Sequence, residues 1–84
     1  MADETVTLAQ ALDMFAEIFE FPVTQLSLGT TQAEIAGWDS MGVLSMMAEF
    51  DSRFGITLTS NQLDSLKSIG SLVDILKANN KLID

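Results

Sequence analysis

The chain has no cysteine and no histidine among its 84 residues, and these two absences remove most of the chemistry that a small protein performs unaided. Without cysteine it has no disulfide framework, no thiolate ligand for a metal and no cysteine nucleophile. Without histidine it lacks the usual general base, the commonest metal ligand and any Ser-His-Asp triad. We therefore expect no metal site and no enzymatic activity.

Positive charge is scarce as well, since four lysines and arginines stand against twelve acidic residues and the net charge is −8. Neutralising the phosphates of a nucleic acid requires many basic side chains, so we expect no nucleic-acid partner, and an acidic membrane surface is disfavoured for the same reason. A protein with a basic docking patch is a more plausible partner, because opposite charges speed association. An alternative interpretation fits equally well, in which the negative charge only keeps a small domain soluble.

Long apolar runs are also missing. No run approaches the roughly 18 residues of a membrane span, and residues 1–4 are acidic and polar, unlike a signal peptide. We expect a cytoplasmic protein without stable membrane insertion. Its hydrophobic content of 48% is sufficient for folding, and a chain of this length predicts a single domain over residues 1–84, which we expect to be a monomer.

Apolar residues follow the spacing of an amphipathic helix in several segments, of which the first covers about residues 6–19. Thr7 and Gln10 have the spacing of a capping box at its start. Residues 20–38 show no period and predict a long ordered loop, with a helical turn around 31–36. The apolar residues expected to anchor this loop are Leu26, Leu28 and Ile35.

The second helix is the clearest, and we expect it from Asp39 or Ser40 to about Phe54. Gly55 is placed to end it in the left-handed conformation. Its apolar stripe is expected to comprise Val43, Met47, Phe50 and Phe54, widened by Leu44 and Met46.

Two further helices are expected, a short one over about 61–66 that Ser60 caps, and a final one to about Ala78 that Ser68 caps. No segment alternates for long enough to form a sheet. The pattern predicts an all-α fold, a small four-helix bundle of three longer helices and one short helix, with the long ordered loop after the first.

Ser40 is the candidate functional residue because it lies at the start of the second helix. The first N–H groups of a helix lack intrahelical acceptors and carry partial positive charge, so a phosphate ester on Ser40 would be stabilised there. Asp39 can cap the same helix, and Gly37 is expected to let the chain turn sharply into it. The plainer interpretation is that Asp39 and Ser40 are capping residues and nothing more.

The order of motifs resembles that of an acyl carrier protein over almost the whole chain. Asp39-Ser40-Met41 opens an apolar helix, Phe54-Gly55-Ile56-Thr57-Leu58 follows it, and the final helix opens with Ser68-Ile69-Gly70-Ser71-Leu72. The resemblance implies a 4′-phosphopantetheine arm attached to Ser40 by a phosphopantetheinyl transferase. It also implies that the arm's thiol holds acyl groups as thioesters, and that the protein is a substrate shuttle for acyl-processing enzymes such as synthases, acyltransferases or ligases.

In this family the exposed face of the second helix recognises partners, and in carriers of fatty-acid synthesis it bears several acidic residues. The resemblance implies docking through Met41, Ser45, Ala48 and Asp51, of which Asp51 alone is acidic. This departure makes a specialised discrete carrier, in polyketide, nonribosomal-peptide, lipid-modifying or aminoacyl-transfer chemistry, as good a fit as the fatty-acid pathway.

The core residues of the later helices have two interpretations. They fill the core, as methionines usually do, or a cleft opens among them to shelter an acyl chain; the cleft would be lined by Met47, Phe50, Leu63 and Ile69. Trp38 is expected to anchor the loop, with a docking role as its alternative. The alternative function for the whole chain is an unmodified acidic helical adaptor that binds a partner without using Ser40.

Overall fold

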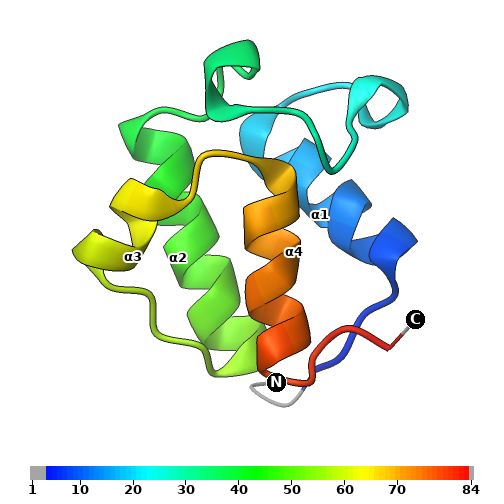
Figure 1. Ribbon diagram of the computed structural model, residues 1–84, viewed down its shortest axis with the longest axis vertical. Helices are drawn as coiled ribbons and strands as arrows, with labels where there is room; N and C mark the ends of the chain where they lie inside the picture. Colours follow the sequence, from blue (N-terminus) through cyan, green and yellow to red (C-terminus); the bar gives the residue numbers. More distant parts are fainter. Residues whose placement is uncertain (1–3, 84) are drawn as a thin grey trace.

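The structure, a computed structural model, describes residues 4–83, and helices are its main secondary structure (Figure 1). Its α-helices are α1 (Leu8–Phe19), α2 (Ser40–Phe54), α3 (Ser60–Ser65) and α4 (Ile69–Ala78), and two 3-10 turns, η1 (Val23–Gln25) and η2 (Gln32–Glu34), lie in the loop between α1 and α2. Within this described part the extended backbone forms only isolated bridges, Val6 with Leu82 and Thr31 with Ser68. The predicted all-α bundle with a long first loop is therefore confirmed.

Helices α1, α2 and α4 enclose the core, and the short α3 lies beside α2 (Figure 1). The loop between α1 and α2 crosses one end of the bundle, and the two ends of the described chain meet at the other. None of the helices within residues 4–83 combines the length and the apolar content that crossing a membrane requires.

The start of α1 is set by a capping box, as the spacing predicts. The Thr7 hydroxyl accepts the backbone N–H of Gln10 at 3.1 Å, and the Gln10 side chain accepts the N–H of Thr7 at 2.9 Å. The helix begins at Leu8 rather than at residue 6, because Val6 pairs with the end of the chain. The N–H of Val6 donates to the carbonyl of Lys81 at 2.9 Å, and the carbonyl of Val6 accepts the N–H of Ile83 at 2.9 Å.

The cap of α3 is one residue earlier than expected. Ser60 was the predicted cap, but Thr59 occupies that position and forms a capping box with Gln62. The spacing of Thr59 and Gln62 matches the capping-box pattern, in which the side chains at the cap and the third helical position satisfy each other's backbone N–H groups. For α4 the predicted Ser68 cap and the end at Ala78 are confirmed.

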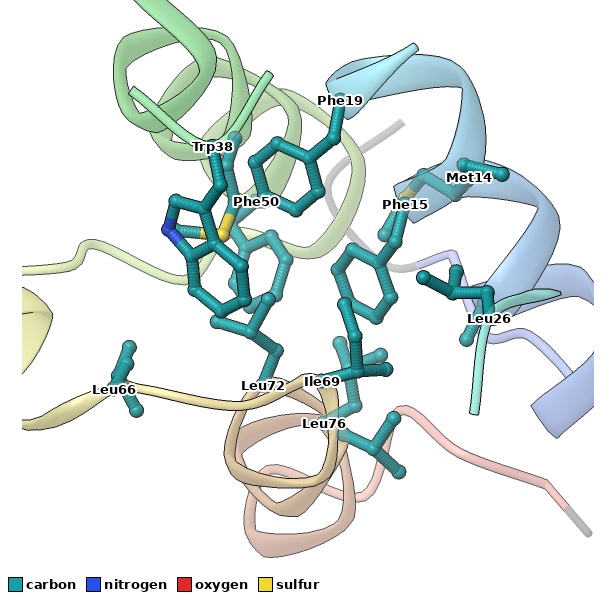
Figure 2. Close-up of a cluster of buried hydrophobic side chains, with 14 of the residues drawn as sticks. Met14, Phe15, Phe19, Leu26, Trp38, Phe50, Leu66, Ile69, Leu72 and Leu76 are labelled. Carbon is teal, nitrogen blue, oxygen red and sulfur yellow. The ribbon is translucent and has the colours of Figure 1, made fainter. Parts of the chain in front are cut away.

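The buried face of α2 packs into the bundle through four residues spaced four apart: Gly42, Met46, Phe50 and Phe54. Figure 2 shows Phe50 among Phe15 and Phe19 of α1, with Leu72 of α4 directed toward the same space. Val43 and Met47 lie partly buried beside this row. The prediction that Leu44 widens the apolar stripe is wrong, because Leu44 points away from the core and is 59% exposed.

The loop between α1 and α2 is held to the core by Leu26, Ile35 and Trp38, which are buried. Leu28 was expected to act in the same way, but its side chain is 44% exposed. Its backbone makes the connection instead, because the Leu28 carbonyl accepts the N–H of Gly70 at 2.8 Å. Thr30 adds a second bond to the same helix, accepting the N–H of Ile69 at 2.9 Å. The loop is therefore ordered by backbone hydrogen bonds as well as by apolar contacts.

Candidate functional site

Ser40 is the first residue of α2, and its side chain is exposed. The preceding Asp39 has extended backbone and caps the helix, its carboxylate accepting the N–H of Gly42 at 3.0 Å. The hydrogen bonds described for residues 4–83 include none to the Ser40 hydroxyl. Asp39 thus performs the capping that a serine often performs, and the Ser40 hydroxyl is left facing solvent.

The chain enters α2 through a close contact with the end of α1. A Cβ atom added to Gly37 would lie 1.9 Å from the carbonyl oxygen of Phe19, and one added to Gly42 would lie 2.2 Å from the carbonyl oxygen of Gly37. The predicted turn at Gly37 is present, with the N–H of Trp38 donating to the carbonyl of Ile35 at 3.0 Å around it, although among the described glycines only Gly55 has a positive φ. Close approach of two backbone segments is therefore the reason for glycine at position 37.

Trp38 completes this junction and confirms its predicted role as an anchor. Its ring is 5% exposed and stacks on Phe19, with centroids 4.9 Å apart and planes inclined by 12°. Figure 2 shows the two rings side by side at the end of α1. The side chain of Gln32 also donates to the Trp38 carbonyl at 3.4 Å. Ser40, two residues later, is held at a fixed position on the surface.

The outer face of α2 after Ser40 is unusually apolar. Met41 is 72% exposed and Leu44 is 59% exposed. The other predicted docking residues, Ser45, Ala48 and Asp51, are exposed as well. Leu44 was predicted to lie on the buried stripe and not on this face, although its position four residues after Ser40 was a signal, because residues four apart share one side of a helix.

Two grooves flank this outer face. The first, which we call the acidic groove, lies between α1 and α2, has a volume of about 360 Å³ and is lined by Met14, Glu17, Ile18, Glu20, Ser45, Glu49 and Arg53. The second, which we call the apolar groove, lies between α2 and the segment before α3, has a volume of about 310 Å³ and is lined by Met47, Ala48, Asp51, Thr57 and Leu58. The predicted docking residues are therefore divided, with Ser45 on one side of the helix and Ala48 and Asp51 on the other.

The four residues predicted to line an acyl cleft all belong to the hydrophobic core. Phe50 and Ile69 are completely buried, and Met47 and Leu63 are partly buried against them. Met47 also lines the apolar groove, whose other described lining residues do not include Phe50, Leu63 or Ile69. A cleft lined by all four stays a prediction.

Comparison with known families gives one finding. A family model described as a phosphopantetheine attachment site matches residues 9–76, which run from the second residue of α1 almost to the end of α4. The match includes the whole of α2 with Ser40 and Asp39. No curated protein and no solved structure matches the chain.

Proposed function

Because the chain belongs to the phosphopantetheine attachment site family, whose prosthetic group is a covalently bound 4′-phosphopantetheine, we propose that Ser40 is the residue to which this group is attached. The observation that carries the proposal is the exposed Ser40 hydroxyl at the start of α2, beside a carboxylate that already caps the helix. An enzyme can therefore reach the Ser40 hydroxyl, for which no hydrogen bond is found within the described residues.

The surroundings of Ser40 fit a phosphodiester. Its negative charge would lie at the N-terminus of α2, where backbone N–H groups point outward and the helix dipole is positive. An anion at such a terminus is stabilised by about 0.3–1 kcal/mol when exposed. Gly37 and Trp38 hold the preceding backbone against Phe19, so the attachment point stays fixed while the group extends into solvent.

The proposed role is that of a carrier. When bound, the group supplies a terminal thiol that holds acyl groups as thioesters, a group that the chain's own side chains do not provide. The chain contributes a folded surface that partner enzymes recognise. The attached group serves as a flexible tether, which raises the effective concentration of the cargo at each docked enzyme. The partners would be a phosphopantetheinyl transferase and acyl-processing enzymes such as synthases, acyltransferases or ligases.

The surface of α2 supports a proposal about the pathway in which the carrier acts. Between Ser40 and Ala48 its exposed positions are Met41, Leu44 and Ser45, and none carries a charge. A partner that recognises this stretch cannot do so through acidic side chains, which supports our proposal that the protein is a carrier of a specialised pathway rather than of general fatty-acid synthesis. Polyketide, nonribosomal-peptide, lipid-modifying and aminoacyl-transfer chemistry all fit this description.

The attachment is tested by incubating the protein with coenzyme A and a phosphopantetheinyl transferase and weighing it by mass spectrometry. The wild type should gain the mass of one 4′-phosphopantetheine, and Ser40→Ala should gain nothing. Ser52→Ala is the matched control, since this serine is exposed on the same helix, is not among the predicted docking residues and should leave loading intact. A folded wild type that several transferases fail to load, or a loaded Ser40→Ala variant, would contradict the proposal and favour the unmodified acidic adaptor.

A further inference from the structure

Gly42 is the third residue of α2 and is buried, although glycine forms helices poorly and alanine forms them well. A left-handed backbone is not the reason for it, since among the described glycines only Gly55 has a positive φ. A Cβ atom on residue 42 would overlap the carbonyl oxygen of Gly37 and lie 3.1 Å from the Cδ1 atom of the Phe19 ring. Glycine at this position therefore lets the first turn of α2 lie directly against the backbone that leads into it.

The contact at Gly42 continues to the end of α1. Gly37 lies in turn against Phe19, whose carbonyl oxygen a Cβ atom on residue 37 would overlap. Phe19 is the last residue of α1, and its ring stacks on Trp38 with centroids 4.9 Å apart (Figure 2). Two backbone contacts in succession, Gly42 on Gly37 and Gly37 on Phe19, therefore hold the first turn of α2 to the end of α1.

Ser40 belongs to the same turn as Gly42 and moves with it. The Asp39 carboxylate accepts the N–H of Gly42 at 3.0 Å, and the Asp39 carbonyl accepts the N–H of Val43 at 2.9 Å, so both bonds close around Ser40. At 3.6 residues per turn, Ser40 and Gly42 are about 200° apart around the helix, and the exposed Ser40 lies opposite the buried Gly42. A displacement of Gly42 away from Gly37 would therefore carry Ser40 outward.

We propose that Gly42 is a positioning residue for the attachment reaction, because its contact with Gly37 sets where the Ser40 hydroxyl meets coenzyme A. This inference rests on the proposed function, since it concerns the reaction at Ser40. In that reaction the Ser40 Oγ forms a bond to the phosphorus that bears the pantetheine. The anhydride P–O bond of coenzyme A breaks, adenosine 3′,5′-bisphosphate leaves with its electron pair, and the hydroxyl proton passes to a base of the transferase. A misplacement of about 1 Å can slow such a step about a hundredfold.

Gly42→Ala tests the contact through the kinetics of loading with coenzyme A and a phosphopantetheinyl transferase. The added methyl group must lift the first turn of α2 from Gly37, so kcat should fall about ten- to hundredfold. KM should stay within about twofold of the wild-type value, because the exposed side chains of α2 are unchanged and only the transition state loses an interaction. A variant that keeps the wild-type kcat would overturn the proposal.

Gly70→Ala is the matched control for a loss of stability. Gly70 is the second residue of α4, and a Cβ atom there would lie 2.9 Å from the carbonyl oxygen of Leu28. The variant therefore crowds a backbone carbonyl in the first turn of a different helix. It should keep the wild-type kcat at a temperature where both variants are folded. Equal losses of kcat in Gly42→Ala and Gly70→Ala would assign the effect to stability and remove the positioning role.

Phe19→Leu tests the same support with a milder change, and it decides the question if Gly42→Ala does not fold. The Phe19 ring stacks on Trp38 at the junction, whereas the Phe15 ring packs on Phe50 with centroids 6.2 Å apart. Both phenylalanines are buried on α1, so Phe15→Leu is the matched control for the lost core volume. We expect kcat to fall about three- to tenfold in Phe19→Leu alone, the effect of a smaller displacement. Equal kcat values for the two variants would contradict the proposal.

Hydrogen exchange reports the position of the turn without any transferase. The amide at residue 42 is bonded to Asp39, and its protection factor should fall about tenfold in Gly42→Ala but not in Gly70→Ala. An unchanged protection factor would show that the turn has not moved and would sink the proposal. The two proposals also fail differently. A folded wild type that no transferase loads overturns the attachment at Ser40, whereas normal loading of both the wild type and Gly42→Ala overturns the positioning role alone.

Discussion

The two sides of α2 are built differently, and the difference separates what holds the helix from what the helix displays. On the α1 side, backbone approaches backbone at Gly37, Trp38 stacks on Phe19, and Arg53 joins Glu49 and Glu4. On the α3 side, the helix borders an open apolar groove and a helix of six residues.

This comparison assigns stability to one side of α2 and recognition to the other. The junction at Gly37 has no spare volume, in contrast to the acidic groove further along α2, so residues at this junction should tolerate little change. The α3 side presents partly exposed apolar residues whose contacts are incomplete, which is the usual character of a surface that meets a partner. Substitutions at the closely packed junction should therefore cost more unfolding free energy than substitutions on the α3 side.

The largest effect is expected for Gly37→Ala on the α1 side. Its new Cβ would overlap the backbone of Phe19, which cannot move as the end of a flexible side chain can. We expect the free energy of unfolding to fall by about 3 kcal/mol, the upper part of the range for overpacked sites, as measured by urea denaturation. Gly29→Ala is the control, because a Cβ there meets nothing nearer than 4.0 Å. Equal stabilities of the two variants would show that the junction is loose.

A smaller loss of unfolding free energy, again measured by urea denaturation, is expected for Thr59→Ala on the α3 side. The variant loses both bonds of the Thr59 hydroxyl with the backbone and side chain of Gln62, and the loss of an N-cap costs about 1 kcal/mol. Thr57→Ala, two residues earlier in the extended segment, is the control. A loss as large as that of Gly37→Ala would remove the contrast between the two sides.

Most of the fold could be predicted because its signals are local. The capping box of Thr7 and the left-handed Gly55 need only their neighbours in sequence, and both are present as expected. The cap of α3 was placed one residue late although the spacing of Thr59 and Gln62 is local, and other errors occurred where a contact with a distant part of the chain decides. Val6 pairs with the chain end, and the Leu28 side chain is exposed while its carbonyl bonds to Gly70.

The features of the candidate site also fall into those that local sequence predicts and those that contacts between distant residues decide. Asp39 as the cap of α2 follows from its place before an apolar helix, and the structure confirms it. The tight approach of Gly37 to Phe19 joins residues 18 positions apart, so no local pattern contains it. The exposure of Leu44 had one local signal, its position four residues after Ser40, but it follows from Gly42 and Met46 facing the core.

The smallest effect is expected for Arg53→Gln, and it tests whether charge also holds the α1 side. Both ion pairs of Arg53 join side chains about 40% exposed, and such surface pairs contribute about 0.2–1 kcal/mol each. The backbone bond from the Glu4 N–H to the Arg53 carbonyl, at 3.0 Å, survives the substitution. We expect the free energy of unfolding in urea to fall by about 0.5 kcal/mol at low salt, and by less at about 1 M salt, where the Debye length is about 3 Å. A loss that salt does not reduce would assign Arg53 a packing role, since Arg53 lines the acidic groove together with Met14 and Ile18 and an arginine stem can pack on apolar surface.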